Sequence, residues 1–347
     1  MENKQENSDM QSTEEMQEDE IFDDSLFEES MKQANHKKNG NKIHIIFFAI
    51  VLLLFLFAII RFLIWNKGTE SGYNPDEDTS EFDTEPLDYI QPLNSSQLEG
   101  KPDDGVTTIF CLGNSPFSDN GRDNYLAKEL GEKYDATVVN ASFPGSLQTQ
   151  FNPSYSDEEP RDGISLLSVT SALVTGDFST VDKAAAAVSE EASAQAEYLK
   201  TVDLSKADML VIMYDLNDYT ELRPVYDPGN TGNPVTFAGA LESSIQLIQN
   251  KYPYIRIVVL SIPASGKTID DYYVDGDIHD LGNGTLTDYL GHEANICMSN
   301  GVSFIDTYFG VINVDNRDRY LTDDYHLNEA GAGAIADRVY KLIGLTE

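Results

Sequence analysis

The sequence predicts an α/β domain, a three-layer α/β/α sandwich around a central parallel sheet, preceded by a single transmembrane helix. In the larger, C-terminal part of the 347-residue chain, short β-branched apolar runs alternate with longer helical patterns, an alternation that implies crossover connections and a parallel sheet. The apolar runs would be buried on both faces, so helices should cover both sides of the sheet. Before them lies one apolar run long enough to cross a bilayer.

This run covers residues 43–65 and is almost wholly apolar. About 23 residues rising roughly 1.5 Å each would span about 34 Å. A cleaved signal peptide would have a shorter apolar region and no long polar segment before it, so a signal anchor is favoured. Four lysines precede the span, against one arginine and one lysine at its far end (Lys32, Lys37, Lys38 and Lys42; Arg61 and Lys67). The positive-inside rule then predicts a single-pass protein of the cell membrane, with a cytoplasmic N-terminus and an extracytoplasmic C-terminal domain.

Two polar segments flank the span. Residues 1–42 are acidic, with few large apolar side chains, and are expected to be a disordered cytoplasmic tail. A short motif at 21–27 could dock a cytoplasmic partner, but a solvated tail is the simpler interpretation. Residues 66–104 have a similar composition with four prolines, which predicts an extended extracytoplasmic tether. The remaining residues, 105–347, form the expected domain.

Five strands and three helical patterns are expected in this domain. The strands are expected at 106–112, 136–140, 209–214, 255–262 and 302–305, and the helices at 124–134, 237–250 and 284–299. Ligands of open parallel sheets bind beyond the carboxyl ends of the strands. Functional residues should therefore directly follow these runs.

A helical insertion is expected at about 146–205, a stretch longer than one crossover requires. It contains an Ala-rich pattern in which Ser179 and Asp182 have the spacing of a capping box. The insertion could shape a substrate pocket at the carboxyl edge, or it could only cover the sheet. The sequence leaves both alternatives open.

Composition excludes several classes of function. The chain has 23 Lys plus Arg against 59 Asp plus Glu, a net charge of −36, which argues against nucleic acid and anionic polymers as partners. Cys111 and Cys297 are too few for a disulfide framework or a zinc site and are expected to be buried apolar residues. No glycine-rich phosphate loop follows the first strand, so no cofactor is expected.

Four short motifs follow the expected strands in order. They are Gly113-Asn114-Ser115, Asn140 with Gly145, Asp215-Leu216-Asn217-Asp218, and Asp323-x-x-His326. In this order and spacing the chain resembles the SGNH or GDSL-type hydrolase superfamily from about residue 106 to the C-terminus. The resemblance implies a flavodoxin-like α/β/α fold and hydrolysis of carboxylic esters.

The chemistry of these residue types agrees with the resemblance. A serine hydroxyl becomes a good nucleophile when a neutral imidazole accepts its proton and a carboxylate orients that imidazole. Ser115, His326 and Asp323 are the candidates for these three roles. The resemblance implies an oxyanion hole made by the backbone N–H groups of Ser115 and Gly145 and the side-chain amide of Asn217.

Each assignment has an alternative. His279 and His292 are rival bases in the domain, although they are expected to be surface residues, and Asp324 could orient the imidazole instead of Asp323. Asn217 could instead form hydrogen bonds within its own loop.

Two residues depart from the family pattern. Asn114 stands where the family has Asp, and Asp215 stands where it usually has Gly. A carboxylate beside the oxyanion site would oppose the developing charge. Asp215 should therefore point away, be neutralised or weaken the activity.

The expected function is hydrolysis of a short acyl ester, such as an acetyl group on a polysaccharide, through an acyl-serine intermediate. With a neutral imidazole as base, activity should fall as the pH drops through about 6.5. Two alternatives remain: an O-acyltransferase acting on cell-envelope glycans with the same site, and a non-catalytic envelope module that binds or scaffolds.

Overall fold

The computed structural model describes residues 28, 32, 45–61, 85–118 and 125–344. The chain divides into two compact units, Met1–Phe82 and Asp83–Glu347. Each unit is described by itself.

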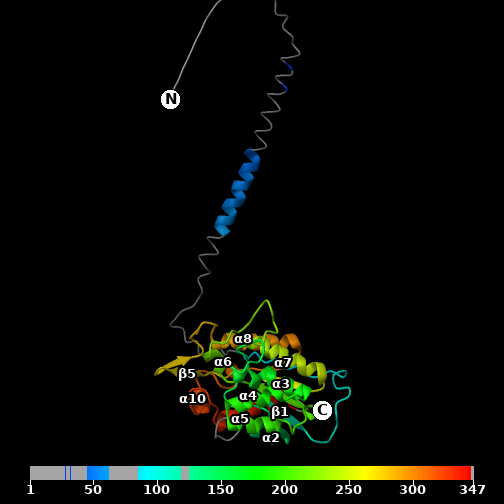
Figure 1. Ribbon diagram of the computed structural model, residues 1–347. Coiled ribbons are helices and arrows are strands. Elements are labelled where there is room, and N and C mark those ends of the chain that lie inside the picture. Colours follow the sequence, from blue (N-terminus) through cyan, green and yellow to red (C-terminus); the bar gives the residue numbers. More distant parts are fainter. Residues whose placement is uncertain (1–27, 29–31, 33–44, 62–84, 119–124, 345–347) are drawn as a thin grey trace, which may run out of the picture. The chain divides into compact units, whose positions relative to one another are not determined.

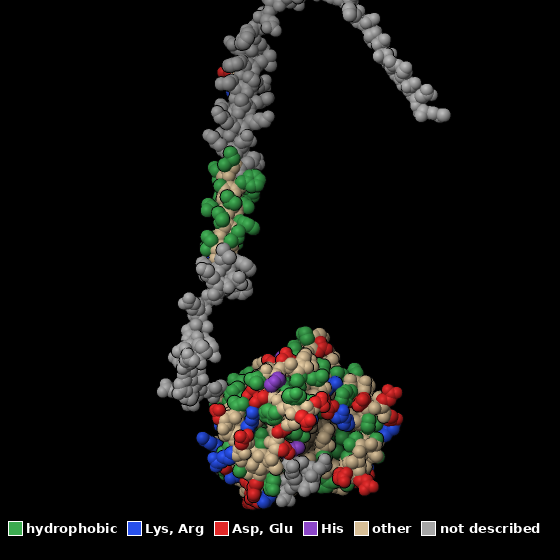
Figure 2. All heavy atoms as spheres, turned by 90° about the vertical axis from the view of Figure 1, so that its left-hand side faces the viewer, with side chains coloured by type: hydrophobic (Ala, Val, Ile, Leu, Met, Phe, Trp, Pro, Cys, Tyr) green, Lys and Arg blue, Asp and Glu red, His purple; other side chains and the backbone are tan. Residues whose placement is uncertain are grey.

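In the first unit, residues 45–61 are helical, and their side chains are largely hydrophobic (Figure 2). Within the described part of the chain, no helix combines the length and the apolar character needed to cross a membrane. The predicted span at 43–65 continues past the described helix at both ends. Nearly all of the predicted tail at 1–42 also lies outside the described residues. The membrane anchor and the tail therefore stay predictions.

The second unit is built on a five-stranded sheet in which every neighbouring pair is parallel. The strand order is β2-β1-β3-β4-β7. The bounds are β1 Thr108–Gly113, β2 Thr137–Asn140, β3 Met209–Met213, β4 Arg256–Leu260 and β7 Ser303–Ile305. All five predicted strands are present, and the predicted α/β class is confirmed.

Helices cover both faces of this sheet (Figure 1). Phe110 and Leu112 of β1 belong to one core cluster, whereas the alternate residues Ile109 and Cys111 belong to the other. The first cluster packs against α3 Leu166–Thr175, α4 Ser179–Val188, α5 Glu190–Leu199, α7 Phe237–Lys251 and α8 Leu286–Asn300. The second packs against α2 Tyr125–Tyr134 and α11 Glu329–Ile343. Shorter helices are α6 Asn217–Thr220, α9 Thr307–Gly310 and α10 Arg317–Tyr320, with 3₁₀ turns at Pro160–Ile164 and Leu204–Lys206.

The helical insertion covers the sheet rather than standing apart from it. Ala184 and Ala185 of α4 are fully buried in the same core cluster as Phe110 of β1. The capping box predicted at Ser179 is wrong, because α4 already begins at this residue and no side-chain cap bond is present there. Instead, Ser189 ends α4 and begins α5, accepting a hydrogen bond from the Ala192 N–H at 3.0 Å. Spacing alone does not reveal which serine leaves the helical conformation.

The folded unit begins earlier than the predicted boundary at residue 105. Tyr89, expected in the tether, pairs with Phe304 of β7 in an antiparallel bridge with N···O distances of 2.9 and 2.7 Å. Next to it, Asp88 forms an ion pair with Arg338 of α11. Strand β7 is the last strand of the sheet, so its outer backbone groups need such a partner.

A two-stranded hairpin was not predicted. It consists of β5 Gly266–Ile269 and β6 Tyr272–Asp275. Its turn residues Asp270 and Asp271 both have positive φ, at 49° and 66°, as in a type I′ turn. Because Asp-Asp is a weak signal for this turn, the hairpin was missed.

Candidate functional site

The carboxyl ends of β1 and β3 approach closely at the predicted nucleophile. A Cβ added to Gly113, the last residue of β1, would lie 1.9 Å from the carbonyl oxygen of Met213 at the end of β3. Only glycine allows this approach. The residues that follow these two strands, Ser115 and Asp215, therefore come into contact.

Ser115 is half-buried, and its hydroxyl donates a hydrogen bond of 2.6 Å to Oδ2 of Asp215. Asp215 is 3% exposed. Burial raises the pKa of this carboxyl, while hydrogen bonds from Ser115, Asn217 and Asn114 and the charge of His326 act to lower it. The structure thus places the predicted nucleophile in contact with Asp215, which differs from the family pattern. Asp215 does not point away from the site.

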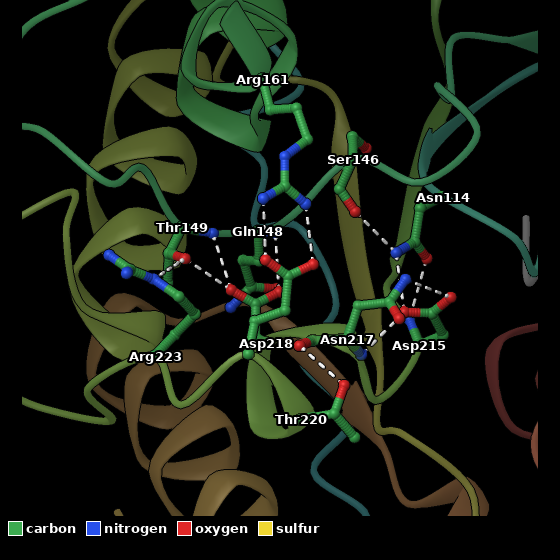
Figure 3. Close-up of polar contacts among 11 residues, drawn as sticks. Asn114, Ser146, Gln148, Thr149, Arg161, Asp215, Asn217, Asp218, Thr220 and Arg223 are labelled. Carbon is green, nitrogen blue, oxygen red and sulfur yellow. Dashed lines mark hydrogen bonds and ion pairs between the residues drawn. The ribbon is translucent and has the colours of Figure 1, made fainter. Parts of the chain in front are cut away.

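Asn114 links the first, second and third motifs. Its amide nitrogen donates to Oδ1 of Asp215 and to the carbonyl of Ser146, both at 2.8 Å, and its amide oxygen accepts from the Asp215 N–H at 2.9 Å (Figure 3). This side chain is fully buried. The two departures from the family pattern, at 114 and 215, are therefore direct partners.

The second motif contains one structural residue and one exposed glycine. The Asn140 amide donates to the carbonyl of Phe117 at 2.6 Å, which fixes the turn after Ser115. Gly145 is exposed with φ of +68°, and its N–H makes no hydrogen bond to any other described residue. That N–H is available to a ligand.

The third motif separates two side chains with different tasks. Asn217, the first residue of α6, donates from its backbone to Oδ1 of Asp215 at 2.9 Å and from its side chain to Oδ2 at 3.1 Å. The next carboxylate, Asp218, faces the loop after β2 instead, accepting from the backbone of Gln148 at 2.8 Å and from the backbone and hydroxyl of Thr149 at 3.1 and 2.6 Å. Burial is the main cause that raises the pKa of Asp218 to about 6.

The fourth motif lies in residues 322–327, here called the base loop. The His326 Nδ1 lies 2.8 and 2.9 Å from the two carboxylate oxygens of Asp323, and the His326 backbone N–H donates to the same carboxylate at 3.0 Å. Burial alone would raise the pKa of Asp323, but these bonds together with the one from the Tyr325 N–H lower it overall. With Nδ1 donating to Asp323, the neutral imidazole keeps Nε2 as its proton acceptor.

Asp324, the alternative partner of the histidine, is engaged elsewhere. Its Oδ2 accepts from the backbone and hydroxyl of Thr268 in β5 at 2.7 and 2.8 Å, and its carbonyl accepts from the Gly266 N–H at 3.2 Å. Lys267 lies over the ring of Tyr325, with Nζ 6.0 Å from the centroid. The hairpin therefore supports the base loop, and this role was not predicted.

The two other histidines of the domain make contacts of their own. His279 is exposed, and its Nδ1 lies 3.0 Å from the Asp275 carbonyl. His292 stacks on Tyr226 with ring centroids 5.2 Å apart. Of the three candidate bases, His326 is the one bonded to the carboxylate of its own motif.

Asn114 and Asp215 were both identified as departures from the family pattern, but their direct contact was not predicted. A signal was present in the sequence: an amide replaces a carboxylate in one motif, and a carboxylate is gained in another. Among the described residues, no group of His, Cys, Asp and Glu side chains could hold a metal ion. Both cysteines are free and buried, as predicted.

The chain is similar to solved structures over nearly their full length. One is 20% identical, with a TM-score of 0.51 over 70% of this chain and 97% of the other. A protein from Lactobacillus plantarum is 18% identical, with a TM-score of 0.50 over 70% and 98% of the two chains. These two likenesses show the fold alone. A possible lipase from Chitinophaga pinensis is 13% identical, with a TM-score of 0.47 over 69% and 99%.

No curated protein matches the sequence. The family model described as GDSL-like lipase/acylhydrolase matches residues 78–339, about three quarters of the chain. This range contains all four motifs and reaches back to the segment around Tyr89 that pairs with β7. The chain therefore belongs to the GDSL-like lipase/acylhydrolase family and is a hydrolase of ester bonds.

Proposed function

We propose that the protein is a membrane-anchored, extracytoplasmic hydrolase that removes short acyl groups, such as acetyl, from esters on a polysaccharide. The reaction class follows from the family. The anchor rests on the apolar run at 43–65, and the uncharged glycan substrate rests on the net charge of −36, which disfavours anionic polymers. The observation that carries the catalytic assignment is the contact of His326 Nδ1 with Asp323 at 2.8 Å.

The proposed reaction begins with attack of the Ser115 Oγ on the ester carbonyl carbon. The hydroxyl proton passes to Nε2 of His326, and the carbonyl π electrons move to the oxygen. Asp323 holds the tautomer and stabilises the imidazolium. When the oxyanion collapses, the ester C–O bond breaks and His326 protonates the departing alkoxide. A water molecule then hydrolyses the acyl-serine by the same two steps.

The developing oxyanion needs donors that are already in place. The backbone N–H groups of Ser115 and Gly145 and the side-chain amide of Asn217 are assigned to it. The Gly145 N–H supports this assignment, because it is exposed and bonds to no other residue that the structure describes, which leaves it accessible to a ligand.

The test is labelling of the full-length protein with a fluorophosphonate probe, which reacts with activated serines. The full chain is used because residues as early as Leu87, whose N–H donates to Asp306 at 3.0 Å, pack on the domain. Labelling of the wild type that is lost in Ser115→Ala and His326→Ala would support the assignment. A folded wild type that stays unlabelled would favour the non-catalytic binding module. Product analysis with an acetylated sugar in water, with and without a second sugar as acceptor, separates hydrolysis from acyl transfer.

A further inference from the structure

The carboxylate of Asp215 is surrounded by hydrogen-bond donors. Its Oδ1 accepts from the Asn114 amide at 2.8 Å (Figure 3) and from the Asn217 N–H at 2.9 Å. Its Oδ2 accepts from the Ser115 hydroxyl at 2.6 Å and from the Asn217 amide at 3.1 Å. A carboxylate offers about four lone-pair positions. Each of these positions on the ionised form of Asp215 therefore has a donor from the protein, and these donors partly offset the cost of its burial.

Two of these donors are groups that the proposed reaction uses. The Ser115 hydroxyl must give its proton to His326, but in this structure it points to Asp215. The Asn217 amide must face the oxyanion, but it too is bound to Asp215. Charge-assisted hydrogen bonds of this kind are about twice as strong as neutral ones. Substrate attack therefore has to break or share both of them.

The charge of Asp215 adds a second obstacle. An anion beside the carbonyl oxygen repels the negative charge that develops there in the transition state. The family usually has glycine at this position, which provides neither the acceptor nor the charge. In the protein without substrate, the Asp215 carboxylate thus binds the Asn217 amide, a donor that the proposed reaction assigns to the substrate oxyanion.

Asn114 explains how the chain buries this carboxylate. An Asp at position 114, as in the family pattern, would place a second buried carboxylate about 2.8 Å from Oδ1 of Asp215. Two carboxylates at this distance cannot both be ionised without a large penalty. The amide of Asn114 instead donates to Asp215 and accepts from its N–H.

We propose that Asp215 is a positioning residue that restrains the site, holding the Ser115 hydroxyl and the Asn217 amide away from the substrate, and that Asn114 and Asp215 form one coupled replacement of the family's Asp and Gly. This inference rests on the proposed function, because it assigns Ser115 and Asn217 their roles. Its consequence is an esterase whose nucleophile is slower than the same scaffold allows.

The test compares the full-length wild type with Asp215→Gly, Asn114→Asp and the double variant, which restores the family pair. The maximal rate of fluorophosphonate labelling and the probe concentration for half-maximal rate are measured separately, with Ser115→Ala as the blank. Asp215→Gly should label at least about tenfold faster, because one charge-assisted bond to the nucleophile is lost. The gain should lie in the maximal rate and not in probe binding. Asp215→Ala repeats the test without the added backbone freedom of glycine.

Thermal unfolding of the same variants tests the coupling. Asn114→Asp alone should melt lower than the wild type and label more slowly, and adding Asp215→Gly should reverse both effects. A purely structural role of Asp215 would lower the melting temperature of Asp215→Gly without raising its labelling rate.

The outcomes separate this inference from the proposed function. The restraint would be overturned if Ser115 of the wild type is labelled and Asp215→Gly and Asp215→Ala label at the same rate or more slowly. The hydrolase assignment would then stand. A wild type that is unlabelled beside a labelled Asp215→Gly would support complete restraint of Ser115 by Asp215, and it would count against the proposed hydrolase activity of the wild type. If neither is labelled although all are folded, both fail.

Discussion

The nucleophile and the base of the site are supported by different kinds of structure. Ser115 follows a central strand of the sheet, and its partner Asp215 is buried and bonded to three other groups from the ends of β1 and β3. His326 lies in the base loop, where the Asp323 side chain is 40% exposed, and the loop is supported by a surface hairpin. The nucleophile is therefore fixed by contacts in the core of the fold, whereas the contacts of the base loop include those among its own residues and those with a surface hairpin.

This difference shows that the sheet fixes the position of the nucleophile more firmly than that of the base. A displacement near Ser115 would require strands β1 and β3 to separate, which the contact at Gly113 opposes. A displacement of the base loop would break the hairpin contacts at Asp324 and the bridge between Leu321 and Leu327, and it would not require the strands of the five-stranded sheet to separate. We therefore expect substitutions far from the site to change the catalytic rate mainly by displacing the base loop.

The largest effect is expected in the base loop itself. Asp323→Asn should lower kcat by about 10³- to 10⁴-fold, because an amide no longer holds the imidazole in the tautomer whose Nε2 accepts a proton. Asp324→Asn is the matched control, since its carboxylate binds Thr268 and not the histidine. Steady-state hydrolysis of p-nitrophenyl acetate measures both. Equal losses in the two variants would mean that the local Asp323–His326 contact is not the orienting one.

On the nucleophile side, Asn217→Ala should lower kcat by about 10²- to 10³-fold if the amide stabilises the oxyanion. The loss should appear in kcat with little change in KM, because the donor acts mainly in the transition state. Thr220→Val is the control, removing a hydroxyl that binds the Asn217 carbonyl at 3.2 Å but no oxyanion donor. A kcat that survives Asn217→Ala would leave this residue with the alternative role of stabilising its own loop.

The two sides should also respond to pH in opposite directions. Asp218, beside Asp215, has its pKa raised to about 6, mainly by burial, so between about pH 4 and 6 the folded state binds more protons than the unfolded state. Its contribution to the free energy of unfolding is full below about pH 4 and is lost as the pH rises through 6, a fall of up to about 3 kcal/mol. Asp323, with a lowered pKa, contributes above its usual pKa and loses that contribution in more acidic solution.

Melting temperatures of the wild type and Asp218→Asn between pH 3 and 8 measure this difference. The variant should be less stable at pH 4, where it lacks the group's contribution, and should show a shallower decline between pH 4 and 6. Parallel curves would show that Asp218 does not titrate in this window, and that its three donors keep it ionised throughout.

The sequence could predict the sheet and the positions of the motifs better than the contacts between them. Strands buried on both faces leave a clear apolar pattern, and the motifs that follow them were found in order, so the sheet and the positions of Ser115, Asn217 and His326 were predictable. The contact between Asn114 and Asp215 joins residues 101 positions apart, and no local pattern encodes such a distance. The hairpin and the pairing of Tyr89 with β7 depend on a weak turn signal and on an open sheet edge, neither of which a periodicity analysis detects.

The smallest effect is expected from the hairpin. Thr268→Val keeps the β-branched shape and the backbone N–H bond to Asp324 but removes the hydroxyl bond of 2.8 Å. Because this contact is exposed, the loss should be about 1 kcal/mol or less, enough to lower kcat by up to about fivefold if the base loop depends on the hairpin. Thr287→Val, a threonine in the first turn of α8, is the control for a comparable substitution away from the loop. Hydrolysis rates of the two variants, measured at equal folded fraction, show whether the base loop depends on the hairpin. An unchanged rate in Thr268→Val would mean that the Asp323–His326 pair keeps its geometry without this hairpin contact. The local support of the base would then have to come from contacts other than the Thr268 hydroxyl, such as those within residues 322–327.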